Sequence, residues 1–237
     1  MFKRLSASLI AASMAFTPAM AQDVPAEATP EAPKTMRIAV SADMNEDREN
    51  ILLLDLSNGE RVAIRLMRDW APNHVERVKT LTRQGFYDGI IFHRVIDGFM
   101  AQTGDPTGTG QGGSTLPDLE EEFNPMPHLR GTVSMARAQS EDSANSQFFI
   151  VFYPRFALDR RYTNFGRVIS NMPAVDAINR GEPPADPTYI VQASIAADNR
   201  PQAFASPAPP PPGQAPAQSA PQLDTNDTEI VPGSIQE

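Results

Sequence analysis

Short apolar runs bounded by turn residues occur seven times along the middle of the chain, and each run predicts a β-strand. An Asn-Gly pair at 58–59 separates the first two runs. Because Asn-Gly accepts positive φ at both central positions of a tight turn, we expect a hairpin there. Two other stretches predict helices, one opening at Pro72 and stopping at Gly85, the other opening at Pro173 and stopping at Gly181. The predicted strands are 51–56, 61–67, 90–95, 131–136, 147–152, 165–170 and 189–195.

Many short strands with only two helices favour a mainly β fold, either an antiparallel barrel or a sandwich. Strands and helices do not alternate regularly, so the pattern disfavours a doubly wound α/β fold. The pattern by itself leaves the choice between barrel and sandwich open.

The N-terminal end of the chain has the order of a secretory signal peptide. A basic pair at 3–4 precedes an apolar run over 5–16, and the small-residue motif Ala-Met-Ala follows at 19–21. The run is shorter than the ~20 residues that span a bilayer, although an uncleaved anchor is the alternative. We expect residues 1–21 to be removed on export, which leaves a periplasmic protein without a membrane anchor.

Proline marks two further segments outside the patterned region. The chain has 23 prolines among 237 residues, about twice the usual share, and nine of them lie beyond Asp198. Segments rich in Pro, Ala, Glu or Gln bury too little apolar surface to offset the entropy of ordering them. We therefore expect a flexible spacer over 22–35 and a disordered tail over 198–237, which leaves 36–197 as one folded domain.

Composition and charge exclude several classes of function. The chain contains no cysteine, which excludes a disulfide framework, a thiolate metal site and a cysteine nucleophile. Its formal net charge of −9 becomes −11 once the two basic residues of the signal segment are removed. So acidic a chain is a poor partner for nucleic acid, whose binding depends on Lys and Arg at the phosphates.

The histidines and glycines give little support for metal, hydrolytic or nucleotide chemistry. His74, His93 and His128 lack metal-ligand spacing, so we expect no metal and no other cofactor. No G-x-S-x-G elbow is present, although residue counting leaves a Ser-His-Asp arrangement open. The stretch 108–113 matches G-x-G-x-x-G but lacks the strand before it and the helix after it that a dinucleotide site needs. We interpret this stretch as irregular backbone with positive φ.

Two parts of the chain concentrate polar and aromatic side chains. Residues 92–105 combine one arginine with aromatic, methionine and glutamine side chains, and 134–137 leads into a second run at 145–150. Because neighbours in a strand point to opposite faces, Gln147 and Phe149 can line a cleft while the alternate residues face the core. Aromatic residues that only fill a barrel are the alternative interpretation.

These segments closely resemble the cyclophilin family of peptidyl-prolyl cis-trans isomerases. The resemblance rests on the Phe-His-Arg-Val-Ile-x-Gly-Phe-Met-x-Gln-x-Gly-Asp run at 92–105 and the Ser-Gln-Phe-Phe-Ile run at 146–150, and it spans 51–195. The chain is most similar to the secreted bacterial branch. The resemblance implies an eight-stranded antiparallel barrel capped by two α-helices. It also implies an enzyme that accelerates rotation about X-Pro bonds, without covalent chemistry, during protein folding outside the cytoplasm.

The resemblance assigns roles to ten residues. Arg94 would donate a hydrogen bond to the prolyl nitrogen of the twisted peptide, and Gln102 would orient Arg94. Gln147 and the backbone at 136–137 would pair with the peptide as an extended strand does. The implied catalytic residues are Arg94, Gln102 and Phe99, and the implied substrate-binding residues are Met100, Ala136, Arg137, Gln147, Phe149, Leu158 and Tyr162.

Three positions depart from the family pattern. Ala157 stands where well-known eukaryotic members carry a tryptophan that supports cyclosporin binding, so we expect weak binding of cyclosporin. Tyr162 stands where histidine is frequent, and a tyrosine hydroxyl still donates a hydrogen bond, so turnover should survive. Arg137 stands where asparagine is common, which bears on subsite preference.

The resemblance implies proline-containing unfolded or extended polypeptides as partners, and we expect a monomer. The alternatives are a proline-peptide-binding chaperone that does not catalyse and an envelope scaffold. The Ala-Pro pairs at 208–209, 215–216 and 220–221 suggest a further hypothesis, that the tail occupies the cleft of its own domain. A simple spacer is the alternative for the tail.

Overall fold

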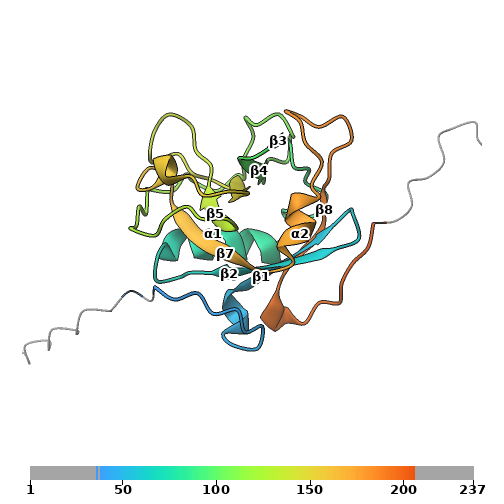
Figure 1. Cartoon of the computed structure of the whole chain (residues 1–237), viewed down its shortest axis with the longest axis horizontal. Coiled ribbons are helices and arrows are strands. Elements are labelled where there is room, and N and C mark those ends of the chain that lie inside the picture. Colours follow the sequence, from blue (N-terminus) through green and yellow to red (C-terminus); the bar gives the residue numbers. More distant parts are fainter. Residues whose placement is uncertain (1–35, 37, 206–237) are drawn as a thin grey trace, which may run out of the picture. The chain divides into compact units, whose positions relative to one another are not determined.

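The computed structural model describes Met36 and residues 38–205 (Figure 1). The predicted signal peptide at 1–21, the predicted spacer at 22–35 and the greater part of the predicted tail, 206–237, lie outside the described residues.

Eight antiparallel strands form one sheet in the order β3-β4-β6-β5-β7-β2-β1-β8. The edge strands β3 and β8 share no ladder, but an isolated bridge joins Ile91 to Tyr189, and the Phe92 N–H donates to the Thr188 carbonyl at 2.8 Å. The sheet therefore curls into an incompletely closed barrel, which confirms the predicted fold class. The strands are β1 (Ile51–Leu56), β2 (Arg61–Leu66), β3 (Arg94–Ile96), β4 (Met100–Thr103), β5 (Thr132–Met135), β6 (Phe148–Val151), β7 (Asn164–Ser170) and β8 (Ile190–Ile195).

Two helices accompany the sheet (Figure 1). Helix α1 (Pro72–Arg83) packs against β8, and α2 (Met172–Asp176) packs against β2. Helix α1 begins with proline, whose missing N–H costs nothing in the first turn. The N–H groups of Asn73 and His74 each donate to the Glu122 carboxylate at 3.0 Å, so a distant loop caps the helix. Among the described residues, no helix is both long enough and apolar enough to cross a membrane.

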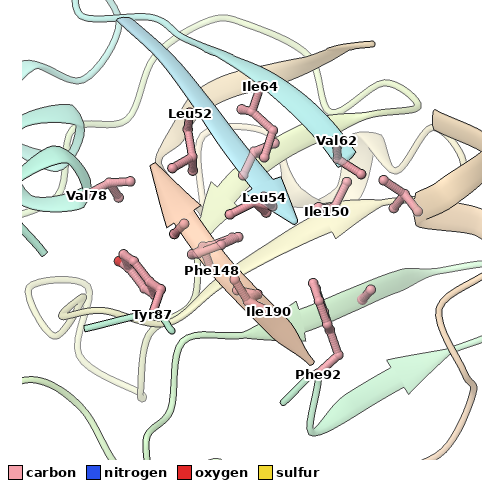
Figure 2. Close-up of a cluster of buried hydrophobic side chains, with 14 of the residues drawn as sticks. Leu52, Leu54, Val62, Ile64, Val78, Tyr87, Phe92, Phe148, Ile150 and Ile190 are labelled. Carbon is pink, nitrogen blue, oxygen red and sulfur yellow. The ribbon is translucent and has the colours of Figure 1, made fainter. Parts of the chain in front are cut away.

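The main core lies between the inner face of the sheet and α1. Phe148 and Ile150 belong to it, while Phe149 belongs to a separate cluster, so β6 divides its side chains between two faces as predicted. The buried Tyr87 completes its hydrogen bonding by donating to the Ser146 carbonyl at 3.1 Å. Figure 2 shows this core, in which the labelled side chains are Leu52, Leu54, Val62, Ile64, Val78, Tyr87, Phe92, Phe148, Ile150 and Ile190.

Three local features differ from the prediction. Helix α2 ends at Asp176, before its predicted stop at Gly181. The strand predicted over 90–95 begins only at Arg94, because the preceding residues contact the β8 segment through isolated bonds and not through a ladder. Strand β4 was missed, because its residues are covered on both faces and show no alternation. The hairpin between β1 and β2 is confirmed, but only Gly59 has positive φ, at 86°, and Asn58 does not.

The folded domain also extends past its predicted end at 197. The carboxylate of Asp55, which is completely buried, accepts hydrogen bonds from the side chains of Arg61 at 2.6 and 2.9 Å and Gln192 at 3.2 Å. It also accepts from the Ala203 N–H at 2.8 Å. A buried carboxylate needs donors on every side, so the segment 198–205 lies on the domain although its composition resembles the tail.

Candidate active site

The sheet brings the predicted residues together in one row across four strands. Arg94 lies directly opposite Gln102, Gln102 opposite Phe149, and Phe149 opposite Ser134. Directly opposite residues of antiparallel strands point to the same face. An arginine, an amide and an aromatic ring are therefore placed side by side on the outer face of the sheet, away from the main core.

A cavity of about 240 Å³ lies over this row. Nine of the ten predicted site residues line it, and the tenth, Gln147, lines an adjoining cavity of about 410 Å³. Both cavities share Gln102, Ala136 and Arg137. The residues of the smaller cavity are Arg94, Phe99, Met100, Gln102, Ala136, Arg137, Phe149, Leu158 and Tyr162.

A directed series of polar contacts runs along the floor of the two cavities. The Arg94 Nη1 lies 3.5 Å from Gln102 Oε1, and Gln102 Nε2 donates to Gln147 Oε1 at 2.9 Å. Gln147 Nε2 then donates to the carbonyl oxygens of Gly110 at 3.1 Å and Gly112 at 2.7 Å. Each amide is thus fixed in one orientation by both of its neighbours, which holds Gln102 with its oxygen toward Arg94.

The glycine-rich loop is held by a buried aspartate, Asp105, which ends the 92–105 run but to which the sequence assigned no role. Asp105 accepts from the N–H groups of Thr107 at 2.7 Å, Gly110 at 2.6 Å and Gly112 at 3.1 Å. Burial alone raises the pKa of this carboxyl, but the donors from Thr107, Gly112 and Gly110 outweigh it and lower the pKa to about 2. Gly110 has φ of 83°, and a Cβ on Gly112 would lie 2.1 Å from the carboxylate, so the loop is irregular backbone as predicted.

Three aromatic rings, those of Phe99, Phe149 and Tyr162, contribute to the walls of the smaller cavity. The guanidinium carbon of Arg155 lies 5.3 Å from the centre of the Phe99 ring. The Tyr162 ring meets Phe149 edge-on, with centroids 5.6 Å apart. Met100 is buried beneath them, with Leu158 partly buried at the side. Phe99 is thus held by Arg155, and Phe149 by Tyr162, which leaves a pocket with apolar walls that suits a compact ring.

The backbone at 136–137 differs from expectation in one respect. The Ala136 N–H already donates to the Gln147 carbonyl at 2.9 Å, so it is not free to pair with a peptide. The Ala136 carbonyl and the Arg137 N–H make no hydrogen bond within the described residues. The Arg137 guanidinium is itself engaged with backbone carbonyls, among them that of Arg161 at 3.1 Å.

A Ser-His-Asp arrangement does exist, but it is structural. The Ser134 hydroxyl lies 2.9 Å from His128 Nε2, and His128 Nδ1 lies 2.8 Å from Asp159. Ser134 is completely buried beside Phe149 on the neighbouring strand, so its hydroxyl cannot reach a substrate. Burial lowers the pKa of His128, although the hydrogen bond to Asp159 acts in the opposite direction. The arrangement anchors the loop that carries Leu158.

One charged neighbour of the site was missed by the sequence analysis. The carboxylate of Glu182 accepts from Arg94 Nε at 2.8 Å. Glu182 lies between a glycine and a proline in a loop, and no pattern in the sequence points to it.

Comparison with known families agrees with the geometry. The model of the cyclophilin type peptidyl-prolyl cis-trans isomerase family matches residues 52–195. A probable peptidyl-prolyl cis-trans isomerase of Brucella suis is 45% identical over 178 residues, which cover 68% of this chain and 90% of that protein. Peptidyl-prolyl cis-trans isomerase B of Bacillus subtilis is 41% identical over 128 residues, covering 54% of this chain and 89% of that protein.

Solved structures show the same fold. A cyclophilin from Hirschia baltica superposes with a TM-score of 0.60 at 29% identity, covering 65% of this chain and 77% of that one. A cyclophilin type peptidyl-prolyl cis-trans isomerase of Cryptosporidium parvum, crystallised in the presence of the dipeptide Ala-Pro, gives 0.57 at 28% identity. That similarity covers 61% of this chain and 98% of the Cryptosporidium protein.

Proposed function

Because the chain belongs to the cyclophilin-type peptidyl-prolyl cis-trans isomerase family, we propose that its isomerase activity resides in the cavity between Phe99 and Phe149 and depends on Arg94. The observation that carries the proposal is the position of the Arg94 guanidinium at the wall of an apolar pocket. Its Nη2 makes no hydrogen bond within the part of the chain that the structure describes, so this group is available to a ligand.

The chemistry requires no nucleophile. Rotation about a peptide bond is opposed by a barrier of about 18–20 kcal/mol, because amide resonance is lost in the twisted state. For X-Pro bonds both isomers are populated, but uncatalysed exchange takes tens to hundreds of seconds. A catalyst need only bind the twisted state more tightly than either planar isomer.

Arg94 supplies that difference. The nitrogen lone pair of a planar amide is delocalised and accepts no hydrogen bond, whereas in the twisted amide the lone pair is localised and can accept one. A guanidinium is always charged and donates strongly. Its hydrogen bond to the prolyl nitrogen therefore forms only as the bond rotates, which lowers the barrier without stabilising the ground state.

The surrounding residues hold the substrate for this step. The proline ring occupies the apolar pocket, and Gln102 orients the guanidinium. The Ala136 carbonyl and the Arg137 N–H pair with the peptide backbone as the edge of a strand does. The substrate class is therefore a proline-containing segment in an extended, unfolded conformation, and the enzyme needs no second copy of itself to complete the site.

The proposed location follows from the N-terminal sequence. A basic pair, an apolar run and an Ala-Met-Ala motif within 1–21 support export to the periplasm, where the enzyme acts on polypeptides that fold after secretion. Expression of the full chain in a bacterial host, followed by fractionation and N-terminal sequencing, tests this. A product that starts at Gln22 in the periplasmic fraction supports the proposal, and full-length protein in the cytoplasm refutes it.

The catalytic proposal is tested by a protease-free isomerisation assay on an Ala-Pro peptide. Arg94→Ala should lower kcat/KM about 100-fold, as loss of a transition-state donor does in other enzymes. The matched control is Arg68→Ala, which removes an exposed arginine outside both cavities. An unchanged rate for Arg94→Ala refutes the mechanism. Wild-type protein that fails to catalyse but slows aggregation of an unfolded client favours the chaperone alternative.

A further inference from the structure

The ion pair between Arg94 and Glu182 is placed by the backbone. Val95 N–H donates to the Gly181 carbonyl at 2.8 Å, and Gly181 N–H donates to the Val95 carbonyl at 2.9 Å. These two residues form an isolated antiparallel bridge between β3 and the loop after α2. Residues that flank such a bridge lie opposite each other, so the bridge puts Glu182 across from Arg94.

The backbone of this loop packs closely against itself at Gly181. Gly181 has φ of 145°, and a Cβ at this position would lie 2.5 Å from the Cα of Pro184. A residue with a Cβ would therefore be strained at position 181, and the two hydrogen bonds to Val95 hold the backbone next to Glu182. The position of the Glu182 carboxylate next to the arginine thus follows from the backbone and does not depend on the ion pair alone.

Glu182 occupies a different edge of the guanidinium from Gln102. The carboxylate accepts from Nε at 2.8 Å, while the Gln102 oxygen lies 3.5 Å from Nη1. Since a guanidinium is rigid and planar, two contacts on different nitrogens define its plane. Nη2 remains free for a ligand within the described residues.

We propose that Glu182 is a positioning residue, which holds the Arg94 guanidinium in the orientation that reaches the prolyl nitrogen; this rests on the proposed role of Arg94. Arginine side chains have many rotamers, and each hydrogen bond made before the substrate arrives removes part of that freedom in advance. The contact to Gln102 is long, so Glu182 provides the stronger of the two restraints. The side chains of Arg94 and Glu182 are 40% and 52% exposed, so their pair adds little to folding stability.

The carboxylate of Glu182 can also act in the opposite direction, by lowering the rate, and the test must separate this effect from positioning. A negative charge beside the guanidinium weakens the field at the prolyl nitrogen, so removing it could increase the rate. Glu182→Gln separates the two effects, because glutamine keeps an acceptor oxygen for Arg94 Nε but carries no charge. Glu182→Ala removes both.

The experiment measures kcat and KM of wild type, E182A and E182Q in the protease-free assay. Positioning predicts that E182A lowers kcat/KM about fivefold, which is about 1 kcal/mol, mainly through kcat. E182Q should keep at least about half of the wild-type value, because its acceptor oxygen remains. The matched control is Asp176→Ala, which breaks the Arg130–Asp176 pair of similar exposure outside the site and should leave both constants unchanged.

Salt gives an independent readout. The screening length shortens to about 3 Å at 1 M salt, so a half-exposed pair is weakened there. Salt removes the contribution of the charge but leaves the acceptor oxygen, so wild-type activity should approach that of E182Q as salt rises, while E182Q and E182A themselves stay constant. In an Arg94→Ala background, E182A should have no further effect, because its action passes through Arg94.

Three results would overturn the inference: E182A equal to or faster than wild type, E182Q as slow as E182A, or an unchanged effect of E182A in the Arg94→Ala background. These results are distinguishable from a failure of the proposed function. If Arg94→Ala itself keeps full activity, the mechanism is wrong. If Arg94→Ala is inactive and E182A is fully active, only the positioning role is wrong.

Discussion

The carboxylate of Asp105 accepts the hydrogen bonds that hold the glycine-rich loop. The variant Asp105→Asn should show how much these bonds contribute to the free energy of unfolding. Four groups donate to the carboxylate, three backbone N–H groups and the Thr107 hydroxyl at 2.8 Å. Asparagine offers one acceptor oxygen and would turn its NH₂ group toward N–H donors. At least one donor of the loop would then be left without a partner.

The lowered pKa gives the magnitude. The pKa of Asp105 falls from 3.8 to about 2 on folding. At 1.36 kcal/mol per pKa unit, this corresponds to about 2 kcal/mol of stability at neutral pH. Because the folded-state pKa is depressed, the contribution is complete above the unfolded pKa and is lost as pH falls toward 2. About 1 kcal/mol of it should already be lost at pH 3.

Urea unfolding of wild type and Asp105→Asn between pH 7 and pH 3 measures this. We expect the difference in unfolding free energy to exceed about 2 kcal/mol at pH 7 and to shrink as the pH falls. Asp69→Asn, which changes an exposed aspartate, is the control for general charge effects. Equal stabilities at pH 7, or a difference that does not change with pH, would show that the carboxylate does not hold the loop.

Three further outcomes are expected. Ala157→Trp should improve the dissociation constant for cyclosporin at least about tenfold, measured by calorimetry, and an unchanged constant would show that this position does not limit binding. Burial lowers the pKa of His93 and His128, so the unfolded chain binds more protons than the folded chain below about pH 6.5. The free energy of unfolding should therefore decline as the pH falls from about 7 to about 5, and a flat profile over this range would contradict the prediction. A chain that ends at 205 should match the full chain in melting temperature and kcat/KM. A chain that ends at 197 should melt at a lower temperature, because the buried Asp55 carboxylate loses the Ala203 N–H donor. If removal of 206–237 increases kcat/KM, the result would instead support a tail that occupies the cleft.

The sequence predicted strands and helices best where one face of an element is buried and the other is not. Helix α1 began and ended close to the predicted residues, because Pro72 opens it and its apolar spacing is regular. Strand β4 was missed because Met100, Ala101 and Thr103 are all buried, which removes the alternation that identifies a strand. The segment 198–205 was assigned to the tail because composition indicates only how much of a segment is buried on average. Composition does not show that the buried Asp55 carboxylate needs a donor from this segment.

The candidate site was foreseen from the family resemblance and only in small part from periodicity. Alternation in β6 correctly put Phe149 on the face opposite the core residues Phe148 and Ile150. It could not place Arg94 beside Gln102, because that neighbour relation depends on the register between β3 and β4. The hydrogen bond from the Ala136 N–H to the Gln147 carbonyl could not be predicted from the sequence either, because it depends on how two separated segments pair.

Two carboxylates to which the sequence assigned no role hold opposite ends of one hydrogen-bonded series. Glu182 fixes Arg94 at one end, and Asp105 fixes the loop that receives Gln147 at the other, with Gln102 between them. The ends should respond differently to solution conditions. The half-exposed pair of Glu182 is weakened by salt, whereas the buried carboxylate of Asp105 is screened very little and is weakened by acid. Salt should therefore lower activity through the Arg94–Glu182 pair, whereas acid should lower stability through the loop of Asp105. The two perturbations thus separate the orientation of Arg94 from the stability of the loop.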